Sequence, residues 1–429
     1  MYPILHGLRV VECASFIAAP SCSLHLLQLG AEVIRIDPIG GGPDFHRWPL
    51  AADGRSSLYW EGLNKGKRSI AVDFASPQGR ELVAQLICAP DSAGLTGGLF
   101  VTNFPVDGFL SHERLSRQRA DLITARVMGW ADGTPAVDYT INAAVGVPDM
   151  TGPAGSHEPV NHVLPAWDLL TGAYAAFSLL AAERQRQQTG LGQELRIPLS
   201  DMAIASLGHL GQIAETLAGA DRPKMGNALF GAFGRDFKTA DGQGLMLVAI
   251  TARQWKGLLT ALSLGDAVAA IEAALGLSFS QDEGLRFTHR ELLTPLVEAA
   301  VARRSAAELG PAFDANGVCW GPYRTLQAAV RDEPRLVRNN PLFTEVNHPS
   351  GQTYPTPGAA ATWAQTERGT PGRAPRLGEH TDQVLADLLG LTGAQIGQFH
   401  DSGRVAGSAG SAAPVDPATS TASTASVHR

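Results

Sequence analysis

Short apolar runs alternate with helical patterns along the first third of the chain. A helical pattern at 21–30 ends at Gly30, and Ser76-Pro77 is typical of a second helix start with proline in the first turn. Strands alternating with helices favour a mostly parallel, doubly wound sheet, and therefore an α/β fold. The five apolar runs that predict its strands are 8–13, 32–37, 68–74, 98–104 and 122–128.

The longest helical pattern lies near the middle of the chain. It starts after Asp168, stays uncharged from 169 to 182, and stops at Thr189-Gly190, which predicts one helix of about 18 residues. Asp168 is predicted at its N-cap, where a carboxylate accepts backbone N–H bonds and stays ionised. The position alone leaves two interpretations open: a cap, or a carboxylate nucleophile at a helix start. A strand at 192–199 and a helix at 201–217 are predicted next.

Later patterns predict a second, smaller domain. A two-strand pattern surrounds Asp241-Gly242, and two helical patterns, 255–264 and 291–304, follow it. The chain from 402 is nearly all Ser, Thr, Ala, Gly and Pro, which predicts a disordered tail. The expected domains are a large one with an N-terminal part, a small inserted α/β domain, the C-terminal part of the large domain, and the tail: 1–224, 225–335, 336–401 and 402–429.

Composition narrows the classes of function. The net charge of -7 shows no excess of basic residues, which argues against a nucleic-acid partner. No apolar run is long enough to span a membrane, and the N-terminus lacks the pattern of a signal peptide. The cysteines are scattered, and no Cys/His cluster indicates a metal. These features favour a cytoplasmic globular protein.

The strand-helix-strand start also raises the possibility of a nicotinamide-dependent dehydrogenase. Asp37, at the end of the second predicted strand, stands where an acid would bind the ribose. However, the first strand-to-helix turn reads ECASFIAAP and has no G-x-G-x-x-G. Without those glycines the backbone cannot approach a pyrophosphate closely, which argues against this interpretation.

Several blocks, taken in order, resemble the class III CoA-transferases (CaiB/BaiF type). Asp168 opens D-x-x-TG, and ER-x-R-x-x-TG-x-GQ follows at 183–193. The resemblance covers about 5–399. It implies a Rossmann-like large domain built from both chain ends, a small middle domain and an interlocked homodimer. The other blocks that carry it are GLRVVE, AEVIRIDPIGGG, NKGKRSIAVDF, VTNF, GVCWGPYRTLQ and RAPRLGEHTDQVL.

The resemblance also implies a set of site residues. Asp168 would attack the thioester of an acyl-CoA substrate, with no metal or other cofactor, since coenzyme A is part of the substrate. A cationic cluster could meet the CoA phosphates as point charges, although a solvated loop explains it equally well. The implied CoA-binding residues are Ile17, Ala18, Val72, Asp73, Asn103, Phe104, Val137, Asp138 and Tyr139, and the cluster is Lys65, Lys67 and Arg68.

Departures from the family pattern narrow the expected chemistry. Ile17 stands where formyl-CoA transferases have a glutamine. Val137 stands where the racemase branch has its catalytic histidine, and losing that base argues against racemisation. Unusual segments resemble a branch that moves CoA between two carboxyls of one dicarboxylate: DPIGGGPDFHRWP, GLNKGKRSIA, LICAP, VDYTIN, NHVLPAWD, ADRPKMGN and FGRDF.

This narrower resemblance implies intramolecular CoA transfer between the two carboxyl groups of mesaconate, through an aspartyl-CoA thioester. Two alternatives stay open. One is an intermolecular CoA-transferase that uses a donor such as succinyl-CoA and a dicarboxylate acceptor, which would need a second acid for turnover. The other is a non-catalytic CoA-binding homologue, which the presence of Asp168 and its helix argues against.

Overall fold

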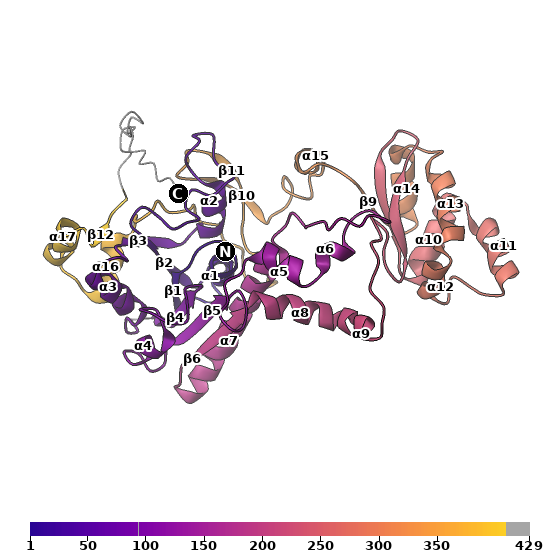
Figure 1. The fold of residues 1–429 in the computed structure, drawn as a ribbon. Coiled ribbons are helices and arrows are strands. Elements are labelled where there is room, and N and C mark those ends of the chain that lie inside the picture. Colours follow the sequence, from indigo (N-terminus) through magenta and orange to yellow (C-terminus); the bar gives the residue numbers. More distant parts are fainter. Residues whose placement is uncertain (93, 409–429) are drawn as a thin grey trace, which may run out of the picture. The chain divides into compact units, whose positions relative to one another are not determined.

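The computed structural model describes residues 1–92 and 94–408. It divides the chain into two compact units (Figure 1). The large unit comprises Met1–Pro135, Asp168–Leu199 and the described residues from Leu342 onward, and the small unit comprises Ala136–Trp167 and Ser200–Pro341. The large unit is thus built from both ends of the chain. The small unit is wider than the predicted segment 225–335, because 136–167 and 200–224 also belong to it.

A seven-stranded sheet organises the large unit. Its strand order is β12-β3-β2-β1-β4-β5-β6, and every neighbouring pair is parallel except β12 with β3. The mostly parallel, doubly wound sheet is thereby confirmed. The strands are β1 (Leu8–Cys13), β2 (Glu32–Pro38), β3 (Arg68–Val72), β4 (Thr96–Thr102), β5 (Ile123–Met128), β6 (Gln193–Pro198) and β12 (Val405–Ala406).

The strand order reverses between β1 and β4, which are neighbours in the sheet but distant in sequence. In open α/β sheets such a switch point leaves a crevice outside the carboxyl ends of the strands, where ligands bind. The segments that follow β1 and β4 are therefore the first place to look for a site.

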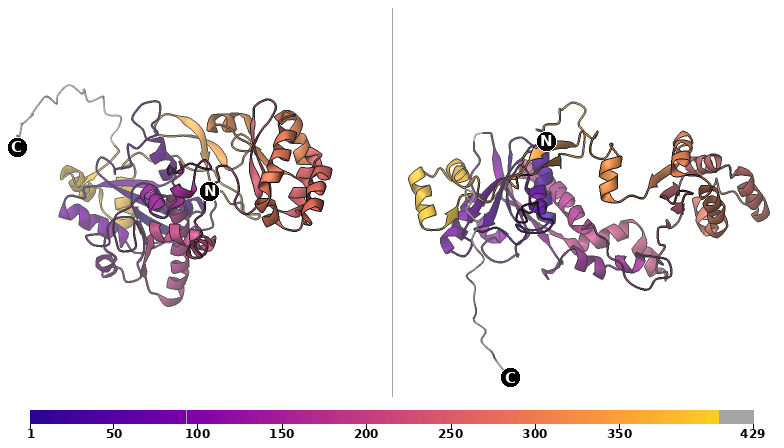
Figure 2. Two further views of the ribbon diagram at one scale, coloured as in Figure 1. Left: turned by 45° about the vertical axis from the view of Figure 1, so that its right-hand side comes forward. Right: turned by 90° about the horizontal axis from the view of Figure 1, so that it is seen from above.

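Helices cover both faces of this sheet. They are α1 (Ala18–Gln28), α2 (Leu58–Asn64), α3 (Pro77–Ile87), α4 (His112–Ser116), α7 (Ala166–Thr189), α16 (Thr381–Leu389) and α17 (Gly393–Asp401). A hairpin of β10 (Phe343–Asn347) and β11 (Thr353–Pro357) completes the unit. The C-terminal elements α16 and β12 lie beside the N-terminal strand β3, and α17 contacts α16 and β12 (Figures 1 and 2).

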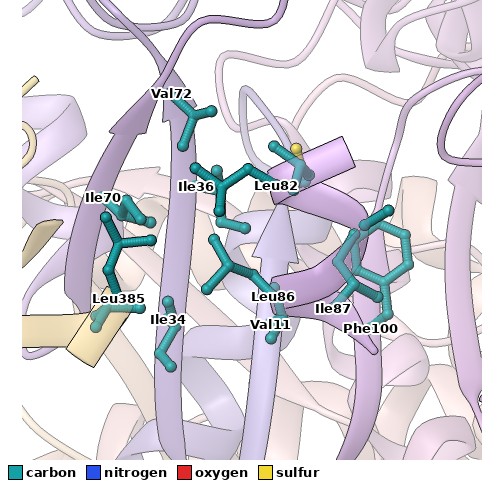
Figure 3. Close-up of a cluster of buried hydrophobic side chains, with 14 of the residues drawn as sticks. Val11, Ile34, Ile36, Ile70, Val72, Leu82, Leu86, Ile87, Phe100 and Leu385 are labelled. Atoms are coloured by element: carbon teal, nitrogen blue, oxygen red, sulfur yellow. The ribbon is translucent and has the colours of Figure 1, made fainter. Parts of the chain in front are cut away.

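The two faces of the central strands differ in chemistry. Alternate side chains, including Val11, Ile34 and Ile70, pack against Leu86 of α3 and Leu385 of α16 in a buried apolar cluster (Figure 3). The residues between them on the strands face the other way. Glu12, Arg35, Asp37 and Ser69 are buried and polar there, and Lys67, just before β3, is buried as well. One face therefore carries this apolar cluster, and the other carries buried charges beside buried apolar side chains such as Val10, Val33 and Val101.

The small unit packs helices on an antiparallel sheet of β7 (Phe233–Lys238), β8 (Gly244–Ala249) and β9 (Cys319–Pro322). The predicted strand pair around Asp241-Gly242 is confirmed. Trp255, Phe279 and Phe313 are fully buried in its core. Its helices are α5 (Asp138–Ala144), α6 (Val147–Met150), α8 (Leu199–His209), α9 (Gln212–Leu217), α10 (Ala252–Leu262), α11 (Gly265–Leu275), α12 (Glu283–Thr288), α13 (Arg290–Val301), α14 (Ala306–Ala315) and α15 (Leu326–Asp332).

Three local predictions are wrong. The helix predicted at 201–217 is interrupted at Gly211, whose φ of 77° is not helical. The tail predicted to be disordered from 402 contains β12, and the remainder of that prediction, 409–429, lies outside the described residues. Asp168 lies inside the first turn of α7 rather than at its N-cap, since the helix begins at Ala166.

Among the described residues, no helix combines the length and apolar character needed to cross a membrane.

Candidate active site

The segment after β1 is tied to the end of β4 by one side chain. The Asn103 amide accepts a hydrogen bond from the Ser15 N–H at 3.1 Å and donates one to the Ser15 carbonyl at 2.9 Å. Both strands end at the switch point, so this pair fixes the two walls of the crevice against each other. Asn103 was predicted to contact CoA. The structure shows its side chain engaged with the backbone of the β1–α1 turn.

The start of α1 offers backbone donors at the same place. Ile17 is the N-cap residue and makes no side-chain cap, and Pro20 in the first turn has no N–H. Within the described residues, the N–H groups of Ala18 and Ala19 have no acceptor. Unsatisfied N–H groups at a helix N-terminus, reinforced by the helix dipole, stabilise an anion or a developing oxyanion.

Helix α7 meets α1 at this start. A Cβ on Gly172 would lie only 1.9 Å from Ser21 Oγ and 2.6 Å from the Ala18 carbonyl oxygen, so the two helices touch at a position that only glycine allows. Asp168 precedes Gly172 by four residues, and residues four apart share one face of a helix. The Asp168 carboxylate therefore belongs to the face of α7 that meets the beginning of α1.

The predicted capping role of Asp168 belongs in part to another carboxylate. In the small unit, Asp138 is 1% exposed and its Oδ2 accepts the N–H of Trp167 in the first turn of α7 at 2.7 Å. His162 Nε2 lies 3.0 Å from the other oxygen of Asp138. Asp138 was predicted to line the CoA site. Its two neighbours there, Val137 and Tyr139, are 53% and 40% exposed.

Tyr59 on α2 is a polar residue near Asp168 that the sequence analysis missed. Its hydroxyl oxygen is buried and has no hydrogen-bond partner among the described residues. Burial raises the pKa of Tyr59, and the nearby Asp44 and Asp168 carboxylates raise it further. The phenol therefore remains a neutral donor at physiological pH. The sequence pattern predicted no helix at 58–64, and no local signal distinguishes this tyrosine.

The residues after β3 and β4 divide between core and turn. Val72 is fully buried in the apolar cluster, and its carbonyl accepts the Ile39 N–H. Asp73 accepts the Ala75 N–H at 2.9 Å, and this bond lowers the pKa of its carboxyl. Phe104 packs edge-on against Phe74, with ring centroids 6.1 Å apart. Val72 therefore presents no side chain to a ligand.

The predicted cationic cluster is not an open patch of charge. Lys67 is buried and donates to Glu12, to Asn64 and to the Pro20 carbonyl, which uses all three of its ammonium hydrogens. Lys65 is 5% exposed and donates to the Gly62 carbonyl. Arg68 pairs with Glu32 at 2.6 Å and with Asp387 at 2.7 Å. The structure thus gives each of these cations a partner within the protein.

No group of His, Cys, Asp and Glu side chains in the described residues could hold a metal ion. The site offers a carboxylate on α7 and the N–H donors at the start of α1. A carboxylate on α7 that faces a helix N-terminus is suited to attack an acyl carbon while the N–H groups receive the charge on its oxygen.

Comparison with known proteins agrees with this class of site. The model of CoA-transferase family III matches residues 5–381, so the chain belongs to that family. It is 50% identical over 408 residues to 2-methylfumaryl-CoA isomerase of Chloroflexus aurantiacus (strain ATCC 29366 / DSM 635 / J-10-fl), covering 95% of this chain and 99% of that one.

More distant relatives share the fold and the family. The human succinyl-CoA:glutarate CoA-transferase is 26% identical, with 94% of this chain and 90% of the relative covered. A crystal structure of a CaiB/BaiF family protein from Brucella suis superposes with a TM-score of 0.72 at 26% identity, covering 90% of this chain and 100% of that one. The resemblance read from the ordered sequence blocks is thereby confirmed.

Proposed function

We propose that this enzyme moves coenzyme A between the two carboxyl groups of mesaconate, converting 2-methylfumaryl-CoA into 3-methylfumaryl-CoA. The observation that carries the proposal is the 50% identity, over nearly the full length of both chains, to a 2-methylfumaryl-CoA isomerase. The geometry agrees, because α7 brings Asp168 to the N-terminus of α1 at the switch point of the sheet.

The proposed reaction starts with nucleophilic attack by the Asp168 carboxylate on the thioester carbonyl carbon. The C–S bond breaks, leaving a mixed anhydride and a CoA thiolate. The thiolate then attacks the aspartyl carbonyl and releases mesaconate, so that Asp168 carries CoA as a thioester. The other mesaconate carboxylate attacks this thioester, and the released thiolate attacks the mesaconyl carbon of the new anhydride. The product leaves and the Asp168 carboxylate is restored.

Three features are proposed to favour these steps. The N–H groups of Ala18 and Ala19 are proposed to receive the oxyanion of each tetrahedral intermediate. Mesaconate stays bound between the two halves of the reaction. The second transfer is then effectively unimolecular, which removes an entropic barrier. Tyr59 is proposed to donate its hydroxyl hydrogen to a substrate carboxylate, since no described residue accepts it.

We further propose that the CoA moiety lies along the carboxyl ends of β1, β3 and β4. There the backbone of Ile17 and Ala18 is available to contact the CoA moiety, while Asp73 and Phe104 line the neighbouring turns. We also propose an interlocked homodimer and a cytoplasmic location. All four cysteines are free thiols, which is consistent with a reducing compartment.

The test is incubation of the pure enzyme with 2-methylfumaryl-CoA, which is mesaconyl-1-CoA, and no added acid. Chromatography then separates the CoA esters, and 3-methylfumaryl-CoA is the 4-CoA isomer. We expect the 4-CoA isomer from the wild type, none from Asp168→Ala, and normal conversion by the control Asp53→Ala, whose carboxylate is exposed on a turn. Added labelled mesaconate should not enter the product. Turnover only in the presence of a second acid would instead show an intermolecular CoA-transferase.

A further inference from the structure

The turn between β1 and α1 contains an unusual backbone conformation. Phe16 has a φ of 69°, and among the described non-glycine residues only Ser263 shares a positive φ. A residue with a Cβ adopts this left-handed region at a cost, and it persists where the surrounding structure fixes it. Phe16 directly precedes Ile17 and Ala18, so its conformation sets the direction in which α1 begins.

One carboxylate holds this conformation. The Phe16 N–H donates to Asp44 Oδ2 at 3.2 Å, and Asp44 is fully buried. The other oxygen of Asp44 approaches the backbone at Gly42, where an added Cβ would lie 3.0 Å from it and 3.3 Å from Ser15 Oγ. The Asp44 loop therefore closes tightly on the β1–α1 turn, with little room to shift.

Asp44 is itself held in place by Arg35. The Arg35 guanidinium lies 3.2 Å from Asp44 and 2.8 Å from Asp37. Its Nη1 atom lies 2.9 Å from Glu12 Oε1. Lys67 pairs with the second oxygen of Glu12 at 2.7 Å. Because the side chains of Arg35, Glu12, Asp44 and Lys67 are all fully buried, the cluster stays desolvated and each partner fixes the next.

The turn is held on its other side by Asn103, through the two hydrogen bonds to Ser15. Two adjacent residues of one turn are therefore each held by a different partner, Ser15 by Asn103 after β4 and Phe16 by Asp44 of the charged cluster. Strained backbone that is fixed by several partners is frequent at active sites. In such a turn the N–H groups must point at a charge that exists only in the transition state.

We propose that Asp44 is a positioning residue, which acts through the Phe16 amide to aim the Ala18 and Ala19 N–H groups at the reacting carbonyl. Arg35, anchored by Glu12 and Lys67, holds Asp44 in its working position. This inference rests on the proposed function, because it assigns the oxyanion donors of that reaction.

The test compares Asp44→Asn and Asp44→Ala with Asp53→Asn. Asp53 also accepts backbone N–H groups, from Arg55 and Ser56, but in an exposed turn. In Asp44→Ala we expect kcat per folded active site to fall roughly 10- to 100-fold with little change in KM for the CoA ester. Asp44→Asn keeps an acceptor oxygen for Phe16 and should lose less. Asp53→Asn should match the wild type.

Hydrogen–deuterium exchange of the wild-type and variant proteins gives a readout that does not depend on activity. The 15–19 segment should exchange faster in Asp44→Ala, while the core strands keep their protection. Unchanged exchange there, or a fall in stability with unchanged kcat per active site, would overturn the proposal. If Asp44→Ala does not fold, Asp44→Asn decides by the same two measurements. Wild-type inactivity on mesaconyl-CoA would refute the proposed function instead, and the exchange data would still decide the role of Asp44.

Discussion

Single residues in this protein are explained by partners that are distant in sequence. Asp44 and Asn103 come from different loops, yet both hold the turn after β1. Lys67 reads in sequence as one of three cations available for phosphate, but its hydrogen bonds are all made inside the protein. A local pattern shows the type of a side chain. It does not show whether that side chain faces a ligand or a buried counter-charge.

Lys65 illustrates this at the level of one ionisable group. Its ammonium donates to the Gly62 carbonyl, and burial, followed by repulsion from Lys67, lowers its pKa to about 8. A folded-state pKa below the unfolded value of 10.5 makes the protonated lysine a cost. That cost is fully present below pH 8 and is relieved as the pH rises from 8 to 10.5.

We therefore predict that Lys65→Met stabilises the protein at pH 7 by roughly 1–3 kcal/mol, and that the gain disappears near the unfolded-state pKa. Urea unfolding at pH 7 and pH 10 measures both values, and Lys256→Met, on an exposed position of α10, serves as the control. The same variant tests the phosphate role, because a raised KM for the CoA ester would assign Lys65 to the substrate.

At the scale of elements, the contact between α7 and α1 brings nucleophile and donors together. Gly172 lets α7 lie against Ser21 and the Ala18 carbonyl, and Asp168 lies one turn earlier. Any group added at Gly172 must push the helices apart, because the close neighbours include backbone as well as a side chain. Asp168 and the start of α1 would then separate.

We predict that Gly172→Ala destabilises the protein by roughly 1–3 kcal/mol and lowers kcat at least tenfold. Gly397→Ala in α17 is the matched control. A Cβ there meets nothing within 4 Å, so better helix propensity should leave stability equal or up to about 1 kcal/mol higher. Urea unfolding measures the stability of both variants, and steady-state kinetics measures their kcat. Equal behaviour of the two would show that the helices are not in close contact.

Element prediction from sequence succeeded where burial is continuous. The strands of the large sheet are sandwiched between helices, so their apolar runs identify them, and β1 was predicted with its observed bounds. It failed where a distant partner sets the boundary. Asp138 accepts a first-turn N–H of α7 from 29 residues away, and the two residues of β12 pair with β3, which no local pattern can show.

At the scale of the whole molecule, α7 carries an apolar stripe that the described residues leave open. Leu170, Tyr174 and Phe177 are 41%, 47% and 66% exposed, and their spacing places them on one side of the helix. A stripe of aromatic and aliphatic side chains is typical of a protein interface. We assign it to the proposed homodimer, because the family resemblance implies interlocked chains and a second copy would cover it.

We predict that Phe177→Glu weakens the dimer roughly 100-fold or more, since each copy would bury a charge in place of an aromatic anchor. Gln188→Glu adds the same charge at an exposed position of the same helix and should leave the dimer intact. Light scattering after size exclusion over a dilution series measures the molar mass. A wild-type monomer at all concentrations would contradict the dimer. A dimer that survives Phe177→Glu would place the interface elsewhere. If the variant is monomeric and also inactive, Asp168 needs the second chain nearby for its chemistry, even though its own unit already holds the nucleophile and the N–H donors.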